Sequence, residues 1–145
     1  MATGLGVGYF PCMPGTIGSL WGIGFCLLLN LWGIPIYVLG VVIFGIVAVK
    51  ISDDADALFG EHDSGKIVID EIVGYLVTML LIPPEIEYLV IGFVAFRFFD
   101  ILKPYPVGMI DKKLRGGLGV VLDDVAAGIY ANALLWVIIV VRGLI

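Results

Sequence analysis

The stretch Pro35-Ile36-Tyr37-Val38-Leu39-Gly40-Val41-Val42-Ile43-Phe44-Gly45-Ile46-Val47-Ala48-Val49 contains no charged residue. On either side of it the chain carries four more apolar stretches, which are Ile17–Trp32, Ile67–Ile82, Tyr88–Ile101 and Val125–Val141. Crossing the hydrocarbon core of a bilayer takes about 20 helical residues, so the shorter stretches must extend into their polar flanks. The pattern predicts an all-α, polytopic integral membrane bundle with about five apolar spans, several of them short.

The composition points to the same class of protein. The chain has 145 residues, of which 61% are hydrophobic and 14% are charged, whereas a soluble domain has about 45–50% apolar and about 25% charged residues. A chain of this size has too little interior to hide so much apolar surface from water. We therefore expect one membrane-embedded domain over residues 1–145, in contact with membrane lipids.

Several classes of protein are excluded or disfavoured at this stage. The net charge of −5 argues against nucleic-acid binding through phosphate contacts. Cys12 and Cys26 are the only thiols and show no spacing typical of a disulfide framework or a zinc site. No basic segment precedes the first apolar stretch, so we expect no cleaved signal peptide.

The distribution of basic residues predicts the orientation. Five spans would place the N-terminal segment, the 50–66 loop and the 102–124 loop on one side of the membrane. That side receives nearly all of the bases, namely Lys50, Lys66, Arg97, Lys103, Lys112, Lys113 and Arg115, and leaves only Arg142 on the other. By the positive-inside rule this side is cytoplasmic. Most acidic residues follow the same partition, so we expect the chemistry to face the cytoplasm.

The adjacent acids Asp70 and Glu71 interrupt the third apolar stretch. Ionisable residues in membrane helices usually face a polar interior or pair with an ion, and a divalent cation is the simplest partner for excess carboxylates. A position in the first helical turn, where acids favour the helix dipole, is the alternative. The apolar residues before Asp70 favour a helix that begins earlier.

A second group of charges lies at the end of the fourth stretch. Arg97, Asp100 and Lys103 are spaced by three residues, so Arg97 and Asp100 share a helix face with Lys103 nearby if the helix persists. An arginine fork and a lysine suit phosphate oxygens, while an aspartate suits magnesium. An ordinary interfacial ion pair with a snorkelling lysine is the alternative.

Asp123 and Asp124 precede the last stretch. Taken alone they fit an N-cap and a first-turn residue as well as they fit catalysis. The N-terminal Pro/Gly-rich segment leads into the first helix with Thr16 and Ser19, which could bind an anion or cap the helix. His62, the only histidine, is either a proton donor or a solvated side chain.

Taken in order, these segments resemble the phosphatidylglycerophosphatase A family of bacterial membrane phosphatases. The resemblance extends over the whole chain and rests on these motifs: Gly4 to Gly8, Pro14-Gly15-Thr16-Ile17-Gly18-Ser19, His62-Asp63, Asp70-Glu71-Ile72-Val73-Gly74, Phe96-Arg97-Phe98-Phe99-Asp100-Ile101-Leu102-Lys103-Pro104-Tyr105-Pro106 and Gly119-Val120-Val121-Leu122-Asp123-Asp124-Val125-Ala126-Ala127-Gly128. It implies hydrolysis of phosphatidylglycerophosphate to phosphatidylglycerol and phosphate, dependence on Mg²⁺, and a place in the bacterial cytoplasmic membrane.

We therefore expect a magnesium-dependent lipid phosphatase whose phosphate-binding groups are Arg97 and Lys103, with Thr16 and Ser19. The metal ligands and the base would come from Asp70, Glu71, Asp100, Asp123 and Asp124, and His62 is a further catalytic candidate. In-line attack by water is the preferred mechanism, with an aspartyl-phosphate intermediate as the alternative.

Two other function classes remain open at this stage, a cation transporter and a non-catalytic membrane subunit. The small-residue pattern Gly18-Ser19-Leu20-Trp21-Gly22 would allow close approach of a neighbouring helix or of a second copy of the chain, so a homo-oligomer also stays open.

Overall fold

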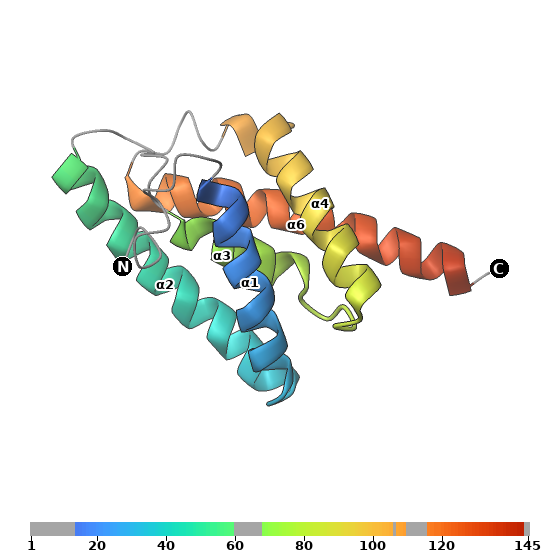
Figure 1. The fold of residues 1–145 in the computed structure, drawn as a ribbon. Coiled ribbons are helices and arrows are strands. Elements are labelled where there is room, and N and C mark those ends of the chain that lie inside the picture. Colours follow the sequence, from blue (N-terminus) through green and yellow to red (C-terminus); the bar gives the residue numbers. More distant parts are fainter. Residues whose placement is uncertain (1–13, 60–67, 106, 110–115, 144–145) are drawn as a thin grey trace.

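The five apolar stretches become five helices in the computed structural model, which describes residues 14–59, 68–105, 107–109 and 116–143 (Figure 1). No strand occurs among these residues. The all-α prediction is therefore confirmed for the described part of the chain. The helices are α1 (Pro14–Asn30), α2 (Ile34–Phe59), α3 (Ile69–Thr78), α4 (Ile86–Leu102) and α6 (Gly117–Gly143).

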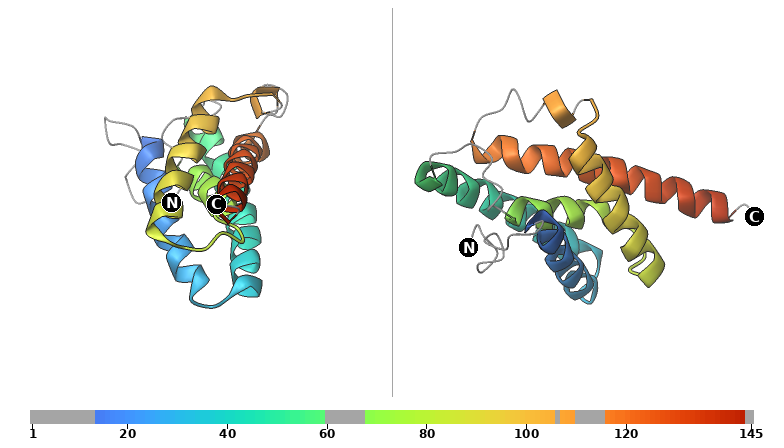
Figure 2. Two further views of the ribbon diagram at one scale, coloured as in Figure 1. Left: turned by 90° about the vertical axis from the view of Figure 1, so that its right-hand side faces the viewer. Right: turned by 45° about the horizontal axis from the view of Figure 1, so that its top comes forward.

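The short helix α3 lies at the centre of the bundle. It contacts α1, α2, α4 and α6, and its residues are buried except for Glu71 and Val77, which are partly buried. The two views of Figure 2 show the longer helices arranged around it. The polar residues that α3 carries are thus held inside the protein.

The number of membrane spans is not confirmed. Two helical segments are long and apolar enough to cross a membrane, Ile34–Asp53 and Gly117–Gly143. In contrast, α3 has ten residues and rises only about 15 Å, half the thickness of a hydrocarbon core. Large apolar side chains are exposed along α1, α2, α4 and α6, and this exposure fits contact with lipid.

The structure corrects three predicted boundaries. Helix α2 continues ten residues beyond Val49 to Phe59, and α6 begins at Gly117, well before the apolar stretch that starts at Val125. Helix α3 stops at Thr78, four residues short of the predicted end. Leu81 has a φ of 62° and two prolines follow at 83 and 84, and these features are incompatible with a continuing helix.

Glycines allow two helices, α1 and α6, to approach α3 closely. A Cβ on Gly128 of α6 would lie 2.4 Å from the carbonyl oxygen of Gly74, and one on Gly22 of α1 would lie 2.9 Å from the Tyr75 Cβ. Gly18 similarly faces Val68 and Glu71. The small-residue pattern of Gly18 to Gly22 therefore serves packing of α1 on α3 within the chain.

Contacts between distant segments place the charged ends of the helices together. The start of α3 lies beside the start of α1, through Gly18 and Glu71. The end of α4 reaches α6 through Lys103 and Asp123, and α2 reaches the start of α6 through Asp53 and Gly117. The three helix starts and two helix ends that the sequence assigned to one side thus meet at one end of the bundle.

Candidate functional site

Three carboxylates from two helices converge at this end. Asp70 and Glu71 come from the first turn of α3, and Asp124 comes from α6. One oxygen of each side chain lies within 4.8 Å of the corresponding oxygens of the other two. Because 53 residues separate Glu71 from Asp124 in the sequence, only the packing of α3 on α6 brings these groups together.

The trio is withdrawn from solvent. Asp70 and Asp124 are 6% and 4% exposed, and Glu71 is partly buried. Glu71 Oε2 and Asp124 Oδ2 are buried and have no hydrogen-bond partner. Clustered anions with unsatisfied oxygens are costly unless a cation joins them. Hard divalent cations prefer several carboxylate oxygens as ligands, so this donor set fits a magnesium ion.

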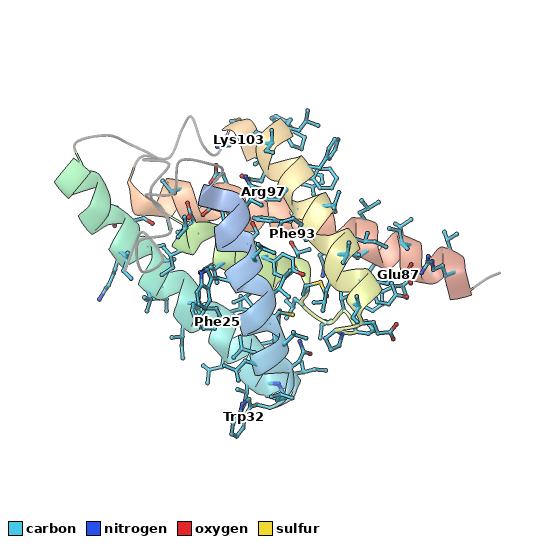
Figure 3. The ribbon with its side chains drawn as sticks, in the orientation of Figure 1. Phe25, Trp32, Glu87, Phe93, Arg97 and Lys103 are labelled. Atoms are coloured by element: carbon cyan, nitrogen blue, oxygen red, sulfur yellow. The ribbon has the colours of Figure 1, made fainter. Side chains whose placement is uncertain are left out.

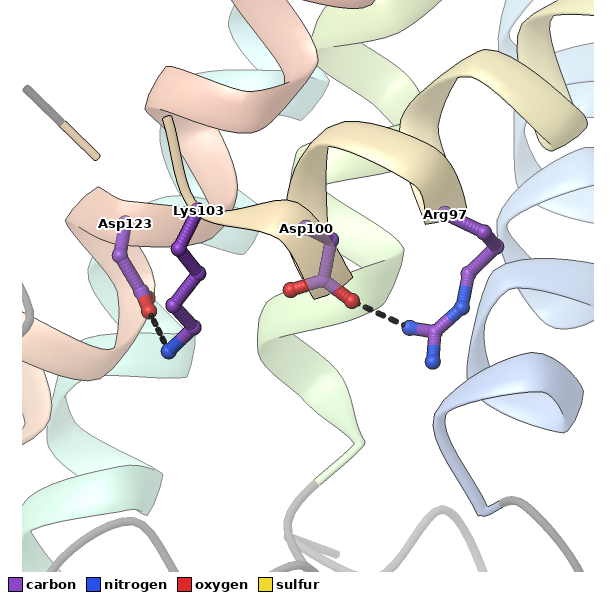
Figure 4. A network of polar contacts seen from close by, with 4 residues as sticks. All are labelled: Arg97, Asp100, Lys103 and Asp123. Carbon is purple, nitrogen blue, oxygen red and sulfur yellow. Dashed lines mark hydrogen bonds and ion pairs between the residues drawn. The ribbon is translucent and has the colours of Figure 1, made fainter. Parts of the chain in front are cut away.

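The positively charged Arg97 of α4 lies near the three carboxylates. The Arg97 Nη1 donates to Asp100 Oδ2 over 2.6 Å, as the three-residue spacing predicted (Figure 4). Asp100 in turn lies within hydrogen-bonding reach of Asp124, and the Arg97 charge acts on Glu71. The Arg97 Nε is buried and donates to no acceptor. The arginine therefore has a donor left for a further anion beside the carboxylates.

Lys103 closes the other edge of the site. It follows the last residue of α4 and adopts a left-handed backbone with a φ of 44°. Its Nζ donates to Asp123 Oδ2 over 2.6 Å, which ties the end of α4 to α6 (Figure 4). The alternative of a snorkelling lysine is not favoured, because the Lys103 side chain is only 28% exposed and pairs with a buried carboxylate.

The structure decides between the alternatives for the two acidic pairs. Helix α3 begins only one residue before Asp70, so Asp70 and Glu71 do lie in the first turn. The expectation that the helix begins well before Asp70 is therefore wrong. The helix dipole of α3 can favour Asp70 and Glu71 at this position, but it does not explain why Asp124 of α6 lies beside them. Conversely, Asp123 and Asp124 are not an N-cap and first-turn pair, because α6 has begun at Gly117.

Of the remaining candidate residues, two lie beside the carboxylate site and one lies outside the described residues. Ser19 is buried on α1 and Thr16 is partly buried near its start. Their neighbour Gly18 faces Glu71, so this turn of α1 borders the carboxylate site. His62 lies outside the described residues. Figure 3 shows Arg97 and Lys103 at one end of α4 and Glu87 at the other.

The sequence reasoning missed two features. Asp53 of α2 accepts a hydrogen bond from the Gly117 backbone NH and so caps the start of α6. In addition, the spacing Asp-x3-Gly-x3-polar occurs twice, once in each half of the site. Its members are Asp70, Gly74 and Thr78 in α3, and Asp124, Gly128 and Asn132 in α6. This recurrence was readable in the sequence, whereas the Asp53 cap had no sequence signal.

Comparisons with known proteins identify the family of this chain. The chain matches the family described as phosphatidylglycerophosphatase A over residues 1–139. A protein of that name from Haemophilus influenzae is 40% identical over 133 residues, covering 90% of this chain and 82% of the relative. The Escherichia coli protein of that name is 34% identical over 139 residues, covering 95% and 81%.

A relative from Bacteroides thetaiotaomicron, provisionally named a phosphatidylinositol-3-phosphatase, is 34% identical over 157 residues and is covered to 93% of its length. It covers 95% of this chain. No solved structure matches the chain. The match over nearly the whole sequence shows that the chain is a phosphatase of phosphate monoesters and belongs to the phosphatidylglycerophosphatase A family.

Proposed function

We propose that this chain hydrolyses phosphatidylglycerophosphate to phosphatidylglycerol and phosphate in a magnesium-dependent reaction. The observation that carries the proposal is the convergence of Asp70, Glu71 and Asp124 within 4.8 Å, with buried unsatisfied oxygens. The names of the two phosphatidylglycerophosphatase A relatives support the substrate. The proposed partners are this lipid substrate and the surrounding membrane lipids.

The residues of the site divide into two roles in this proposal. Asp70, Glu71 and Asp124 hold the metal ion, with Asp100 and Asp123 next to them. When bound, magnesium supplies positive charge to the phosphoryl oxygens. Arg97 binds the phosphate through Nε, which Asp100 does not use, while the bond to Asp100 fixes its guanidinium. Lys103 adds a second positive charge at the edge of the site. We also propose that Thr16 and Ser19 of α1 help to bind the phosphate.

The proposed reaction is an in-line displacement at phosphorus. A water oxygen forms a bond to phosphorus as the ester P–O bond breaks, and one carboxylate takes the proton from the attacking water. The glycerol oxygen leaves and takes up a proton, which His62 is a candidate to supply. The alternative path begins with attack by an aspartate oxygen and forms an aspartyl-phosphate, which water then hydrolyses.

Phosphate release from defined lipid vesicles tests the activity. Purified protein should release phosphate from phosphatidylglycerophosphate with Mg²⁺, lose activity in EDTA, and regain it when Mg²⁺ is restored. Phosphatidylinositol 3-phosphate in parallel vesicles tests the headgroup that the third relative's name suggests. Undiminished lipid hydrolysis after metal removal would refute the metal dependence. Absence of hydrolysis under all metal conditions would refute the proposed substrate.

Acid quenching during turnover distinguishes the two reaction paths. With substrate labelled in the terminal phosphate, direct attack by water leaves no label on the protein. An aspartyl-phosphate path leaves acid-stable protein-bound label that disappears with hydroxylamine.

We further propose that the chain crosses the bacterial cytoplasmic membrane several times with the site facing the cytoplasm. Lys50 is exposed on α2 shortly before Asp53, which bonds to the start of α6, and Trp32 is exposed at the opposite end of α2, in the turn after α1. After Cys12 and Cys26 are replaced by Ser, an impermeant maleimide should label Trp32→Cys in intact spheroplasts and Lys50→Cys only after permeabilisation. The reverse pattern would overturn the orientation.

A further inference from the structure

The C-terminal end of α3 lies buried inside the bundle. The helix stops at Thr78, and the following segment is non-helical up to Glu85. Thr78, Met79 and Ile82 in this region are buried. In an apolar interior the carbonyl groups released at a helix end need donors from neighbouring helices, because water is not available to them.

Side chains from two neighbouring helices supply these donors. Asn132 of α6 donates from Nδ2 to the carbonyl oxygens of Thr78 and Leu80, each over 2.9 Å. The buried Tyr37 of α2 donates from its hydroxyl to the carbonyl oxygen of Leu76 over 2.8 Å. One asparagine therefore satisfies the last carbonyl of α3 and one in the turn beyond it.

The same face of α6 contacts α3 at three successive levels. Asp124 meets Asp70, Gly128 packs on Gly74, and Asn132 bonds to Thr78. Each residue of α6 follows its counterpart in α3 by 54 positions, so the two helices run parallel in one fixed register. A displacement of α3 along its axis would change the separation at the metal site and at Asn132 together.

We propose that Asn132 is a positioning residue, which fixes the depth of α3 against α6 and thereby holds Asp70 and Glu71 beside Asp124. The inference rests on the proposed function for its catalytic consequence, but its structural basis is independent of it. Asn132 does not belong to the carboxylate and cation groups that make up the site. It acts through the helix whose opposite end carries two of the carboxylates.

The test compares two identical substitutions. Asn132→Leu removes the donor at similar volume, and Asn30→Leu is its matched control. Asn30 is the only other asparagine of the chain, and its Nδ2 donates to the Cys26 carbonyl oxygen of its own helix. The control therefore loses a bond of the same type but no link between helices. Asn132→Gln, which retains an amide donor, is the conservative variant.

Three measurements are made on the full-length protein in detergent. Mn²⁺ affinity, read by electron paramagnetic resonance without substrate, should fall about tenfold or more in Asn132→Leu, the scale for groups that orient metal ligands. The kcat should fall with little change in KM for the lipid. Hydrogen exchange of the α3 amides should be faster than in Asn30→Leu. Asn132→Gln should recover part of each loss.

The outcomes separate this inference from the proposed function. If wild-type protein binds Mn²⁺ and hydrolyses the lipid while Asn132→Leu matches Asn30→Leu in both, the inference is overturned alone. If wild-type protein does neither, the proposed function fails, and α3 exchange decides whether Asn132 holds the helix. Failure of both Asn132 variants to fold would also overturn the positioning role, because it would make Asn132 a general stabiliser.

Discussion

The two ends of α4 carry ion pairs of equal length in different surroundings. At one end Arg97–Asp100 and Lys103–Asp123 each have an N–O distance of 2.6 Å, with side chains 5–28% exposed. At the other end Arg142–Glu87 also has a distance of 2.6 Å, but both side chains are about half exposed. Pairs of equal length therefore differ in strength, because water screens the exposed Arg142–Glu87 pair more than it screens the two less exposed pairs.

The difference extends to what lies next to each pair. The Glu87–Arg142 pair joins the start of α4 to the end of α6, and no carboxylate cluster lies beside it among the described residues. The Arg97 and Lys103 pairs border the buried Asp70 and Asp124 and the partly buried Glu71. The charges at the buried end therefore lie close enough to affect one another, whereas the exposed pair links α4 to α6 only.

The largest expected effect comes from removing a single negative charge of the buried group. Glu71→Gln, Asp124→Asn and Asp100→Asn keep the side-chain volume and should each lower kcat about a hundredfold or more, the scale for lost transition-state stabilisation. Phosphate release at saturating Mg²⁺ measures the effect, and circular dichroism checks the fold. Near-normal turnover in all three variants would end the site assignment.

A smaller loss is expected when Arg97 is replaced by Lys. The variant retains the positive charge but loses the planar guanidinium. In the wild type this group donates to Asp100 from Nη1 and leaves Nε available for phosphate. A charge-assisted hydrogen bond contributes about 1.5–3 kcal/mol, so we expect activity to fall about tenfold to a hundredfold. The measurement is kcat/KM on the lipid in vesicles. Wild-type kcat/KM in Arg97→Lys would remove the arginine from phosphate binding.

The stability of the α3–α6 contact should be sensitive to the addition of one methyl group at Gly128. A Cβ at Gly128 would meet the Gly74 carbonyl oxygen, so Gly128→Ala should destabilise the bundle by about 1–3 kcal/mol. Gly45→Ala is the control, since nothing lies within 4 Å of its Cβ position. Thermal unfolding in detergent should separate the two variants. Equal melting temperatures would contradict the close α3–α6 contact.

The smallest effect is expected at the exposed end. The hydrogen bond from Arg142 lowers the pKa of Glu87, so any stabilisation is present above the ordinary glutamate pKa and is lost as pH falls through the lowered value. Glu87→Gln should leave lipid turnover at neutral pH unchanged within error, because the pair is solvent-screened. A turnover loss comparable to that of Asp124→Asn would show that the two ends do not differ as described.

Much of the architecture could be predicted from the sequence. Long apolar runs favour helices in a chain this poor in charge, so each of the five predicted stretches contains a helix, although three boundaries differ. The grouping of charged segments at one end follows from the alternation of helices and short turns. The pairing of Arg97 with Asp100 needed only the helical repeat.

Other features required the tertiary structure. The prolines at 83 and 84 limit α3 locally, but they do not show that the helix stops as early as Thr78, where carbonyl groups near its end accept hydrogen bonds from Tyr37 and Asn132 on other helices. The start of α6 at Gly117 depends likewise on the carboxylate of Asp53. The partner of Lys103 could not be read from spacing, since Asp123 belongs to another helix.

The sequence by itself therefore determined which segments are helical and which residue types could bind a metal ion and a phosphate. Only the tertiary structure decided which carboxylates meet. Asp70 and Asp124 approach each other because Gly74 and Gly128 allow two parallel helices to touch in a fixed register. Side-chain periodicity is a local property of one helix, whereas the register between helices is set by shape and hydrogen bonds across their interface.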